Sequence, residues 1–257
     1  MYPLTDWPLW LLGILCAVVT LIVMCCTISI RRWIGLERLS VNNEVAGFKF
    51  ATIGVLYAVL LGFAVIVVWQ RFNDAENAVA QEAGAAATIY RLAQGLGDTP
   101  GGVIRKRLSA YIEAALTDDW PAMEHGRGSP EARHALDDLY AALLTFYPIN
   151  PRDAGIQGEL LRQLDHLTQA RRDRLVMASG TVPGVIWFVL FGGAIMTISF
   201  TFFFGAENVS VQALMTGIIT ALIFSALLVA VAIDRPFTGS VKVTAEPLAT
   251  VLRDLQT

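Results

Sequence analysis

Residues 59–90, VLLGFAVIVVWQRFNDAENAVAQEAGAAATIY, change from apolar to polar, alanine-rich sequence without a turn signal. Between Phe63 and Glu82 there is neither glycine nor proline, and the frequent alanines after position 74 are the strongest helix formers. One continuous helix from about Val45 to about Leu96 is therefore predicted. At 1.5 Å per residue, its roughly 52 residues would extend about 78 Å, of which a bilayer covers only ~30 Å of hydrocarbon.

The composition indicates a chain that lives in a membrane. Mean hydropathy is +0.55, and only 16% of the residues are charged, which is too few for an ordinary soluble domain. Four apolar runs, at 9–30, 45–69, 182–204 and 214–233, each approach the ~20 residues that a helix needs to cross a bilayer. The predicted fold class is an all-α integral membrane protein with four transmembrane helices, located in the cell (inner) membrane with the lipid bilayer as its main partner.

The apolar runs divide the chain into segments at 1–69, 70–178, 179–235 and 236–257. The second is a helical extramembrane domain inserted between the second and third spans, because its apolar residues recur at helical spacing and nothing alternates with period two. Its three apolar stripes are Leu108, Tyr111, Ile112 and Ala115; Leu136, Leu139, Tyr140, Leu143 and Leu144; and Leu160, Leu161, Leu164 and Leu167. The fourth segment is a tail whose apolar stripe predicts packing against that domain.

The charges near the span ends give two opposing indications of topology. Eight lysines and arginines flank the spans on the side that holds residues 70–178 and the tail, against three or four on the other side. This distribution favours a cytoplasmic domain with both termini inside. The acidic N-terminal segment followed by Arg31 and Arg32 favours the opposite orientation of the first span, and first spans often dominate.

Several function classes lack support in the sequence. A net charge of −3 without a polycationic segment argues against nucleic-acid binding. The histidines His125, His134 and His166 have no metal-ligand spacing, and the pair Asp118 and Asp119 is interpreted as a solvated helix end. No nucleophile elbow or phosphate loop is present, so neither an enzyme nor a cofactor nor a metal site is predicted.

The second span has a face that changes character along its length. At 100° per residue, the polar residues after the apolar run fall on one line, which continues back through that run. Around an axis shared by several copies, this face would form a narrow hydrophobic neck that opens into a polar vestibule. Alternatively, it packs inside a four-helix unit. The candidate pore-lining residues are Thr52, Val55, Val59, Phe63, Ile66, Gln70, Asn73 and Asn77.

Two further sets of residues have predicted structural roles. A stripe at small-xxx-small spacing allows another helix to approach closely, and it comprises Gly47, Ala51, Gly54, Ala58 and Gly62. Four charged residues lie near span ends, namely Glu44, Lys49, Asp234 and Arg235. Glu44 suits the positive end of the helix dipole, Lys49 can extend to lipid head groups, and the last two are interpreted as an interfacial ion pair or cap.

Two stretches resemble a known family: NNEVAGFKFATIGVLYAVLLGFAVIVVWQRFNDAENAVAQEAGAAATIYRLA at 42–93 and DRPFTGSVKV at 234–243. They look like the bestrophin-like domain proteins, predominantly bacterial membrane proteins that are distantly related to bestrophins. The resemblance implies a homo-oligomeric anion channel, a pentamer if it is truly bestrophin-like, with four spans per subunit, cytoplasmic termini and a pore lined by the second helix. The acidic cluster that binds calcium in animal bestrophins is absent, so calcium gating is not implied.

Two hypotheses of function follow. The first is an oligomeric channel for ions, chloride or other small anions by kinship, with a hydrophobic neck on the second span. The alternative is a non-conducting membrane scaffold or sensor that presents the helical domain to a cytoplasmic partner.

Overall fold

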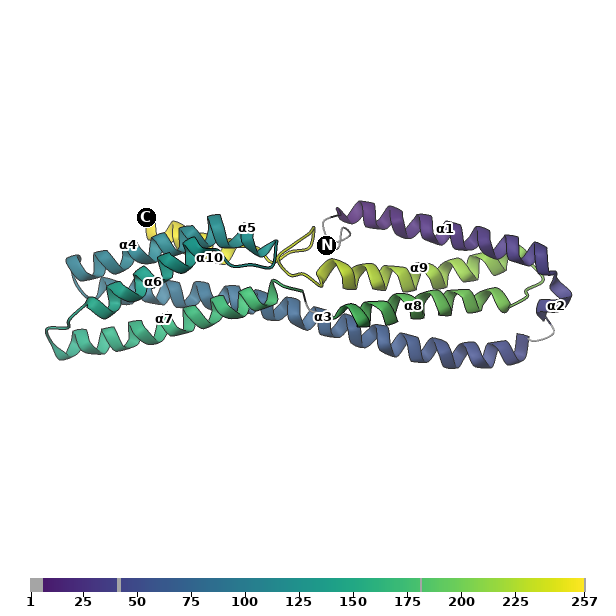
Figure 1. Cartoon of the computed structure of the whole chain (residues 1–257), viewed down its shortest axis with the longest axis horizontal. Coiled ribbons are helices and arrows are strands. Elements are labelled where there is room, and N and C mark those ends of the chain that lie inside the picture. The colour runs from purple at the N-terminus through teal and green to yellow at the C-terminus, as the bar shows by residue number, and fades with distance from the viewer. Residues whose placement is uncertain (1–6, 41–42, 181, 257) are drawn as a thin grey trace. The chain divides into compact units, whose positions relative to one another are not determined.

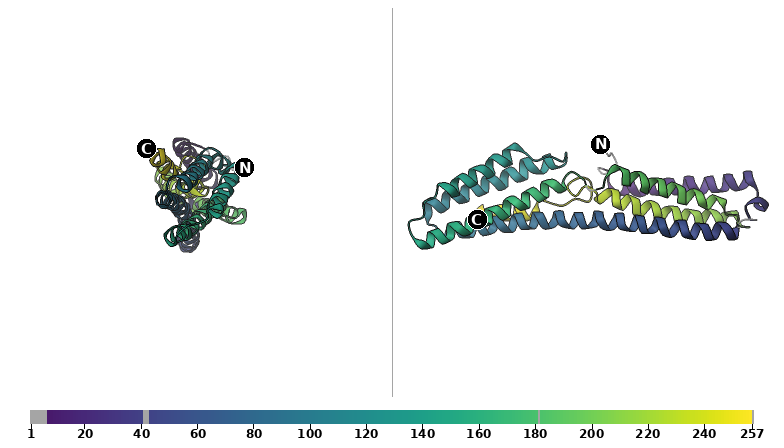
Figure 2. Two further views of the ribbon diagram at one scale, coloured as in Figure 1. Left: turned by 90° about the vertical axis from the view of Figure 1, so that its left-hand side faces the viewer. Right: turned by 60° about the horizontal axis from the view of Figure 1, so that its bottom comes forward.

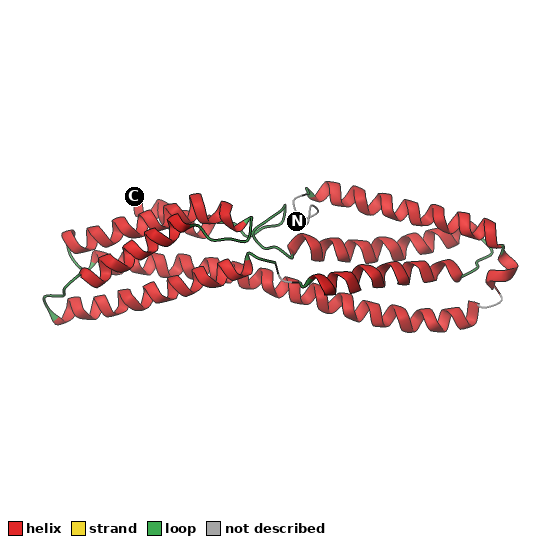
Figure 3. Ribbon diagram, viewed as in Figure 1, coloured by secondary structure: helices red, strands yellow, loops and turns green. Residues whose placement is uncertain are grey.

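The computed structural model describes residues 7–40, 43–180 and 182–256, and this part of the chain is helical without any strand (Figures 1 and 3). The longer helices are α1 (Leu9–Ile34), α3 (Asn43–Gln94), α4 (Asp98–Ala114), α6 (Pro130–Thr145), α7 (Pro151–Met177), α8 (Gly184–Phe200), α9 (Val209–Ile233) and α10 (Glu246–Gln256). The shorter elements are α2 (Leu36–Ser40), the π-helix η1 (Ala115–Asp119), α5 (Trp120–Met123) and the 3₁₀-helix η2 (Thr201–Phe203). The predicted all-α class is confirmed.

The chain divides into two compact units, and α3 contributes to both. Residues 1–70 and 182–234 form the first unit, and residues 71–181 and 235–257 form the second. Within the first unit, α8 and α9 pack against the N-terminal half of α3, and α1 lies on the far side of α9 (Figures 1 and 2). The helices α1 and α9 approach closely at Gly217, where an added Cβ would lie 2.8 Å from the sulfur of Met24.

Four helices of the described chain are long and apolar enough to cross a membrane, as predicted. Their ends differ from the predicted ends for local reasons. The helix α1 continues to Ile34 and so carries Arg31 and Arg32 in its last turn. The helix α9 begins at Val209, five residues before the predicted Leu214, because the Asn208 side chain caps it by accepting from the N–H groups of Ser210 and Val211.

The second unit is built around one apolar core. The predicted stripes of α4, α6 and α7 meet there with Ala86, Ile89 and Ala93 of α3, and Leu248 of α10 is fully buried among them. The start of α4 packs tightly on the end of α3, since an added Cβ at Gly101 would lie 2.1 Å from the Ala93 carbonyl oxygen. One stripe residue, Leu144, is exposed instead, because it lies at the edge of the buried face of α6.

The single long helix predicted from residues 59–90 is confirmed. The helix α3 contains 52 residues and continues through Gly84 without a break. It ends at Gln94, and three residues later Gly97, with a left-handed φ of 83° that favours glycine, precedes the start of α4. The helices α7 and α8, in contrast, are separate elements: Gly180, with a φ of 86°, and Pro183 lie between them.

Candidate functional site in α3 and a buried ion network

The membrane half of α3 packs against its own chain through a face centred on Tyr57. The Tyr57 hydroxyl donates to the Leu190 carbonyl of α8 at 3.1 Å, and an added Cβ at Gly193 would lie 2.7 Å from the Tyr57 ring. Tyr57 and Leu61 form a buried cluster with residues of α8 and α9, including Trp187 and Leu227. This face therefore fixes which way the rest of the helix points.

The candidate pore-lining residues of the apolar run lie on the opposite side of α3, since Val59 and Phe63 are about 160° and 120° from Tyr57 around the helix. Their side chains are exposed: 50% for Val59 and 65% for Phe63, and Thr52, Val55 and Ile66 are exposed too. This face is therefore not packed inside a four-helix unit of the same chain, which was the alternative interpretation of the sequence.

The stripe of small residues lies on the flank between these two faces. A Cβ added at Gly47 would lie 3.9 Å from the Phe204 ring. A Cβ added at Gly54 or Gly62 would have no atom of the described chain within 4 Å, apart from those of α3 itself. Ala51 and Ala58 are exposed. Within the described residues, no other helix approaches Gly54 or Gly62 closely, so the predicted neighbour of this stripe stays a prediction.

Beyond the apolar run, the same line of α3 carries amides. Gln70 and Asn77 are exposed and Asn73 is half-buried. In the second unit, Asn77 and Gln81 line a polar depression of about 340 Å³ between α3 and α7, together with Arg71, Asp74 and Asp173. This part of the face is hydrophilic and open.

The predicted interfacial charges have different surroundings. Glu44 and Lys49 are exposed on the first turns of α3, and their roles as a dipole partner and a head-group contact stay predictions. Asp234 is buried and accepts a hydrogen bond from the N–H of Val182 at 3.0 Å, so it caps the segment that leads into α8. Both Asp234 and Arg235 have additional partners.

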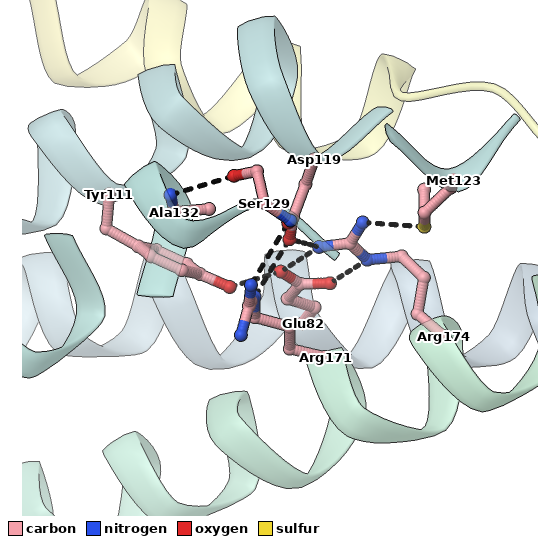
Figure 4. Close-up of polar contacts among 8 residues, drawn as sticks. All are labelled: Glu82, Tyr111, Asp119, Met123, Ser129, Ala132, Arg171 and Arg174. Carbon is pink, nitrogen blue, oxygen red and sulfur yellow. Dashed lines mark hydrogen bonds and ion pairs between the residues drawn. The ribbon is translucent and has the colours of Figure 1, made fainter. Parts of the chain in front are cut away.

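A buried ion network ties together four elements of the second unit (Figure 4). Arg174 of α7 donates to both oxygens of Glu82 in α3, at 2.7 and 3.0 Å, and to Asp119 of η1 at 3.2 Å. Arg171 makes a second bidentate pair with Asp119, at 2.8 and 3.0 Å, and the Tyr111 hydroxyl of α4 donates to Glu82. Two carboxylates and two guanidinium groups thus balance their charges where Glu82, Asp119 and Arg174 are fully buried.

The ion-pair partners of Asp119 and Arg174 keep these two buried side chains in their charged forms. Burial alone would raise the pKa of Asp119, but the hydrogen bonds from Arg171 and the charge of Arg174 outweigh burial and lower that pKa. Burial alone would lower the pKa of Arg174, but the nearby Glu82 carboxylate outweighs burial and raises that pKa. Burial and the Glu82 charge raise the pKa of Tyr111 well above its ordinary value, so its hydroxyl remains a donor.

The remaining sides of the network are covered as well. The Arg174 guanidinium lies over the Trp120 ring, 4.6 Å from its centroid, and donates to the sulfur of Met123 at 3.1 Å. The backbone N–H of Ser129 donates to Asp119 at 2.7 Å, while the Ser129 hydroxyl caps α6 by accepting from Ala132. Every charged group therefore has partners, as buried charges require.

The interpretation of Asp119 as part of a solvated helix end was wrong. The π-helix η1 turns Asp119 into the core, and no sequence signal distinguishes this wide turn from an α-helical one. Arg171 and Arg174 could have been found, because they continue the alternating spacing of four and three residues that Leu160, Leu164 and Leu167 begin along α7. A charged residue on an otherwise apolar stripe is the signal of a buried ion pair.

Within the described residues, no group of three or more His, Cys, Asp or Glu side chains could hold a metal ion. His125 is exposed at the end of α5, and His134 and His166 lie on α6 and α7.

These features define a helical membrane protein with four span-length helices and a second helical unit assembled from the inserted segment and the tail. Residues 10–248 match the family model described as a Bestrophin-like domain, and the chain belongs to that family. Bestrophins are membrane-embedded channels rather than enzymes. A search of curated proteins finds no match to this sequence.

Solved structures show the same fold. A bacterial bestrophin homologue from Klebsiella pneumoniae, solved with zinc phasing, superimposes with a TM-score of 0.72 at 17% identity over 94% of this chain and 96% of that one. A single-substitution variant of the Klebsiella pneumoniae homologue gives a TM-score of 0.74 at 16% identity, over 95% and 99% of the two chains. At such identities the similarity concerns the fold alone.

Proposed function

We propose that several copies of this chain form an ion-conducting pore in the cell (inner) membrane, selective for chloride or other small anions, with the exposed face of α3 around its axis. The supporting observation is that this face lies opposite the packing face of α3 and is apolar through Ile66 and amide-rich from Gln70. Thr52, Val55, Val59, Phe63 and Ile66 would form a neck from which water is excluded, and Gln70, Asn73 and Asn77 would line its wider polar continuation.

The stripe of small residues gives the assembly its contact surface. Gly54, Ala58 and Gly62 leave α3 without bulky side chains on the flank beside the pore face. Close approach of a second copy there would bury backbone against backbone, which is how helices associate in lipid. A pentamer is the assembly that family membership favours, and both termini and the second unit would lie in the cytoplasm.

Replacing Phe63 or Val59 by alanine is expected to raise ion flux several-fold in vesicles that contain the purified protein, because smaller side chains widen and wet the neck. The matched control is Leu60→Ala, which removes a comparably exposed apolar side chain about 100° away from the pore line of the same helix. The measurement is anion efflux under a salt gradient, accompanied by the mass of the assembly in detergent. Absence of flux in wild type and both variants, with a monomeric or dimeric mass, would favour the scaffold hypothesis.

Topology is testable with one reporter cysteine in a variant that lacks Cys16, Cys25 and Cys26. Arg127→Cys lies in the exposed loop after α5, and it should resist an impermeant thiol reagent in intact cells and react after lysis. Glu207→Cys, in the exposed loop between α8 and α9, is the matched control that should react in intact cells. The reverse pattern of labelling would invert the orientation.

A further inference from the structure

The loop between α8 and α9 in the first unit is held in place by two side-chain amides. Asn43 donates to the Gly205 carbonyl at 2.7 Å and accepts from the Gly205 N–H at 3.0 Å. Gln212 donates to the Phe204 carbonyl and accepts from the Ala206 N–H at 3.3 Å. An added Cβ at Gly205 would lie 2.8 Å from a side chain of α2. The loop is therefore a fixed wall, and both amides are already paired.

This wall borders a cavity of about 290 Å³ between α3, η2 and α9. Its interior is mainly aromatic and aliphatic, with Phe50, Phe204, Met215 and Ile219 among the lining residues. The amides that reach it, Asn43 and Gln212, are used to hold the loop. Because few free hydrogen-bonding groups remain, the cavity suits an apolar guest such as an acyl chain.

A buried cation lies beside the same loop. Arg31, in the last turn of α1, is only 8% exposed, and its Nη2 donates to the carbonyl of the cavity-lining Ala206 at 3.1 Å. Its Nε is buried without a hydrogen-bond partner, and no ion pair in the described part of the chain includes Arg31. Buried charges are ordinarily paired, so this guanidinium calls for an anion from outside the chain.

The position of Arg31 indicates what that anion is. It directly follows an apolar stretch long enough to cross the bilayer, so it would lie where the hydrocarbon ends and the lipid head groups begin. Arg32, the next residue, is exposed and adds a second positive charge at this end of α1. A guanidinium matches the oxygens of a phosphate group in geometry as well as in charge.

We propose that Arg31 and the adjoining cavity bind an anionic phospholipid, with the phosphate at the guanidinium and an acyl chain in the cavity. Neither half of the site alone would select this ligand: the cavity does not discriminate among apolar chains, and a single guanidinium holds a free small anion only weakly. Together they select an anionic head group joined to a hydrocarbon chain. This inference goes beyond the proposed pore and does not depend on conduction. Arg31 lies on α1, and α3 lines the cavity through Asn43 and Phe50, which are not among the proposed pore-lining residues.

The test uses the full chain in nonionic detergent and native mass spectrometry, with phosphatidylglycerol, phosphatidylcholine of the same chains, and glycerol phosphate as probes. Wild type should retain phosphatidylglycerol in preference to phosphatidylcholine and should not bind glycerol phosphate measurably. Arg31→Gln should weaken phosphatidylglycerol binding about tenfold or more, since it removes a charge-assisted contact. The matched control Arg32→Gln, exposed and one residue away, should change it much less.

A second variant tests the cavity without touching the charge. Met215 lines the cavity and is itself exposed, so Met215→Trp should fill the opening without disturbing buried packing, and it should weaken binding of both lipids. Equal retention of the two lipids by wild type, competition by glycerol phosphate, or unchanged binding in Arg31→Gln would overturn the proposal. If Arg31→Gln does not fold, unchanged lipid retention in Met215→Trp would overturn it equally.

Discussion

Arg174→Ala is expected to destabilise the second unit by about 3–5 kcal/mol, the range for removing one partner of a buried ion pair. The reason is that Glu82 would be left fully buried with only the Tyr111 hydroxyl as a donor, and Asp119 would lose one of its two cationic partners. Thermal unfolding of the purified protein measures the loss, and hydrogen exchange of α3, α4 and α7 should localise it to the second unit.

An arginine two positions earlier supplies the control for this prediction. Arg172 is exposed on the same helix, so Arg172→Ala should change the free energy of unfolding by no more than about 0.5 kcal/mol. Arg174→Lys should be intermediate, because lysine keeps the charge and loses the two-pronged contact with Glu82. Equal unfolding midpoints for Arg174→Ala and Arg172→Ala would show that the network does not stabilise the unit.

Inserting Gly-Gly-Pro after Phe72 should have a comparably large effect, because it interrupts α3 where the apolar run has just ended. Proline in a helix interior costs about 3 kcal/mol and each glycine up to about 1 kcal/mol relative to alanine. The insertion also separates Phe72 from Ala75 and Val79, with which it contributes to one apolar cluster. We expect a lower unfolding midpoint, loss of the assembled mass in detergent, and loss of any flux.

The matched control is an insertion of Ala-Ala-Ala at the same place. It adds the same length and the same rotation of about 300° while it preserves the helix, so the difference between the two proteins measures helix continuity. If the Gly-Gly-Pro protein keeps wild-type stability, mass and flux, continuity of α3 has no role in the function.

Helix positions could be predicted from sequence because they depend on strong local signals. Hydropathy marks the four spans, and the alanines from Ala75 to Ala87 favour a helix that no proline interrupts. The tail helix follows from its apolar stripe, since Leu248 is buried and Val251, Leu252 and Leu255 pack beside it. Helix ends were less accurate, because a cap such as Asn208 can extend a helix beyond its apolar run.

The stripe of α7 indicates that Arg171 and Arg174 face the core and that Arg172 does not, as the structure has them. The partners of the two buried arginines could not be predicted from the sequence. Their partners Glu82 and Asp119 are 92 and 52 residues away in sequence, so no spacing rule connects them. The buried state of Arg31 is equally non-local, since it depends on a loop 175 residues later.

The burial of Leu248 in the core of the second unit has a consequence for biosynthesis. Most of that core lies in residues 83–167, which leave the ribosome before α8 and α9, whereas α10 follows both of those helices. At roughly 5–20 residues per second, the 81 residues from Leu167 to Leu248 take about 4–16 s to synthesise. During that interval the nascent core has an uncovered apolar surface, and it can close only after the last two spans have been made. Translation thus orders the two units: insertion into the bilayer comes first, and completion of the second unit's core comes last.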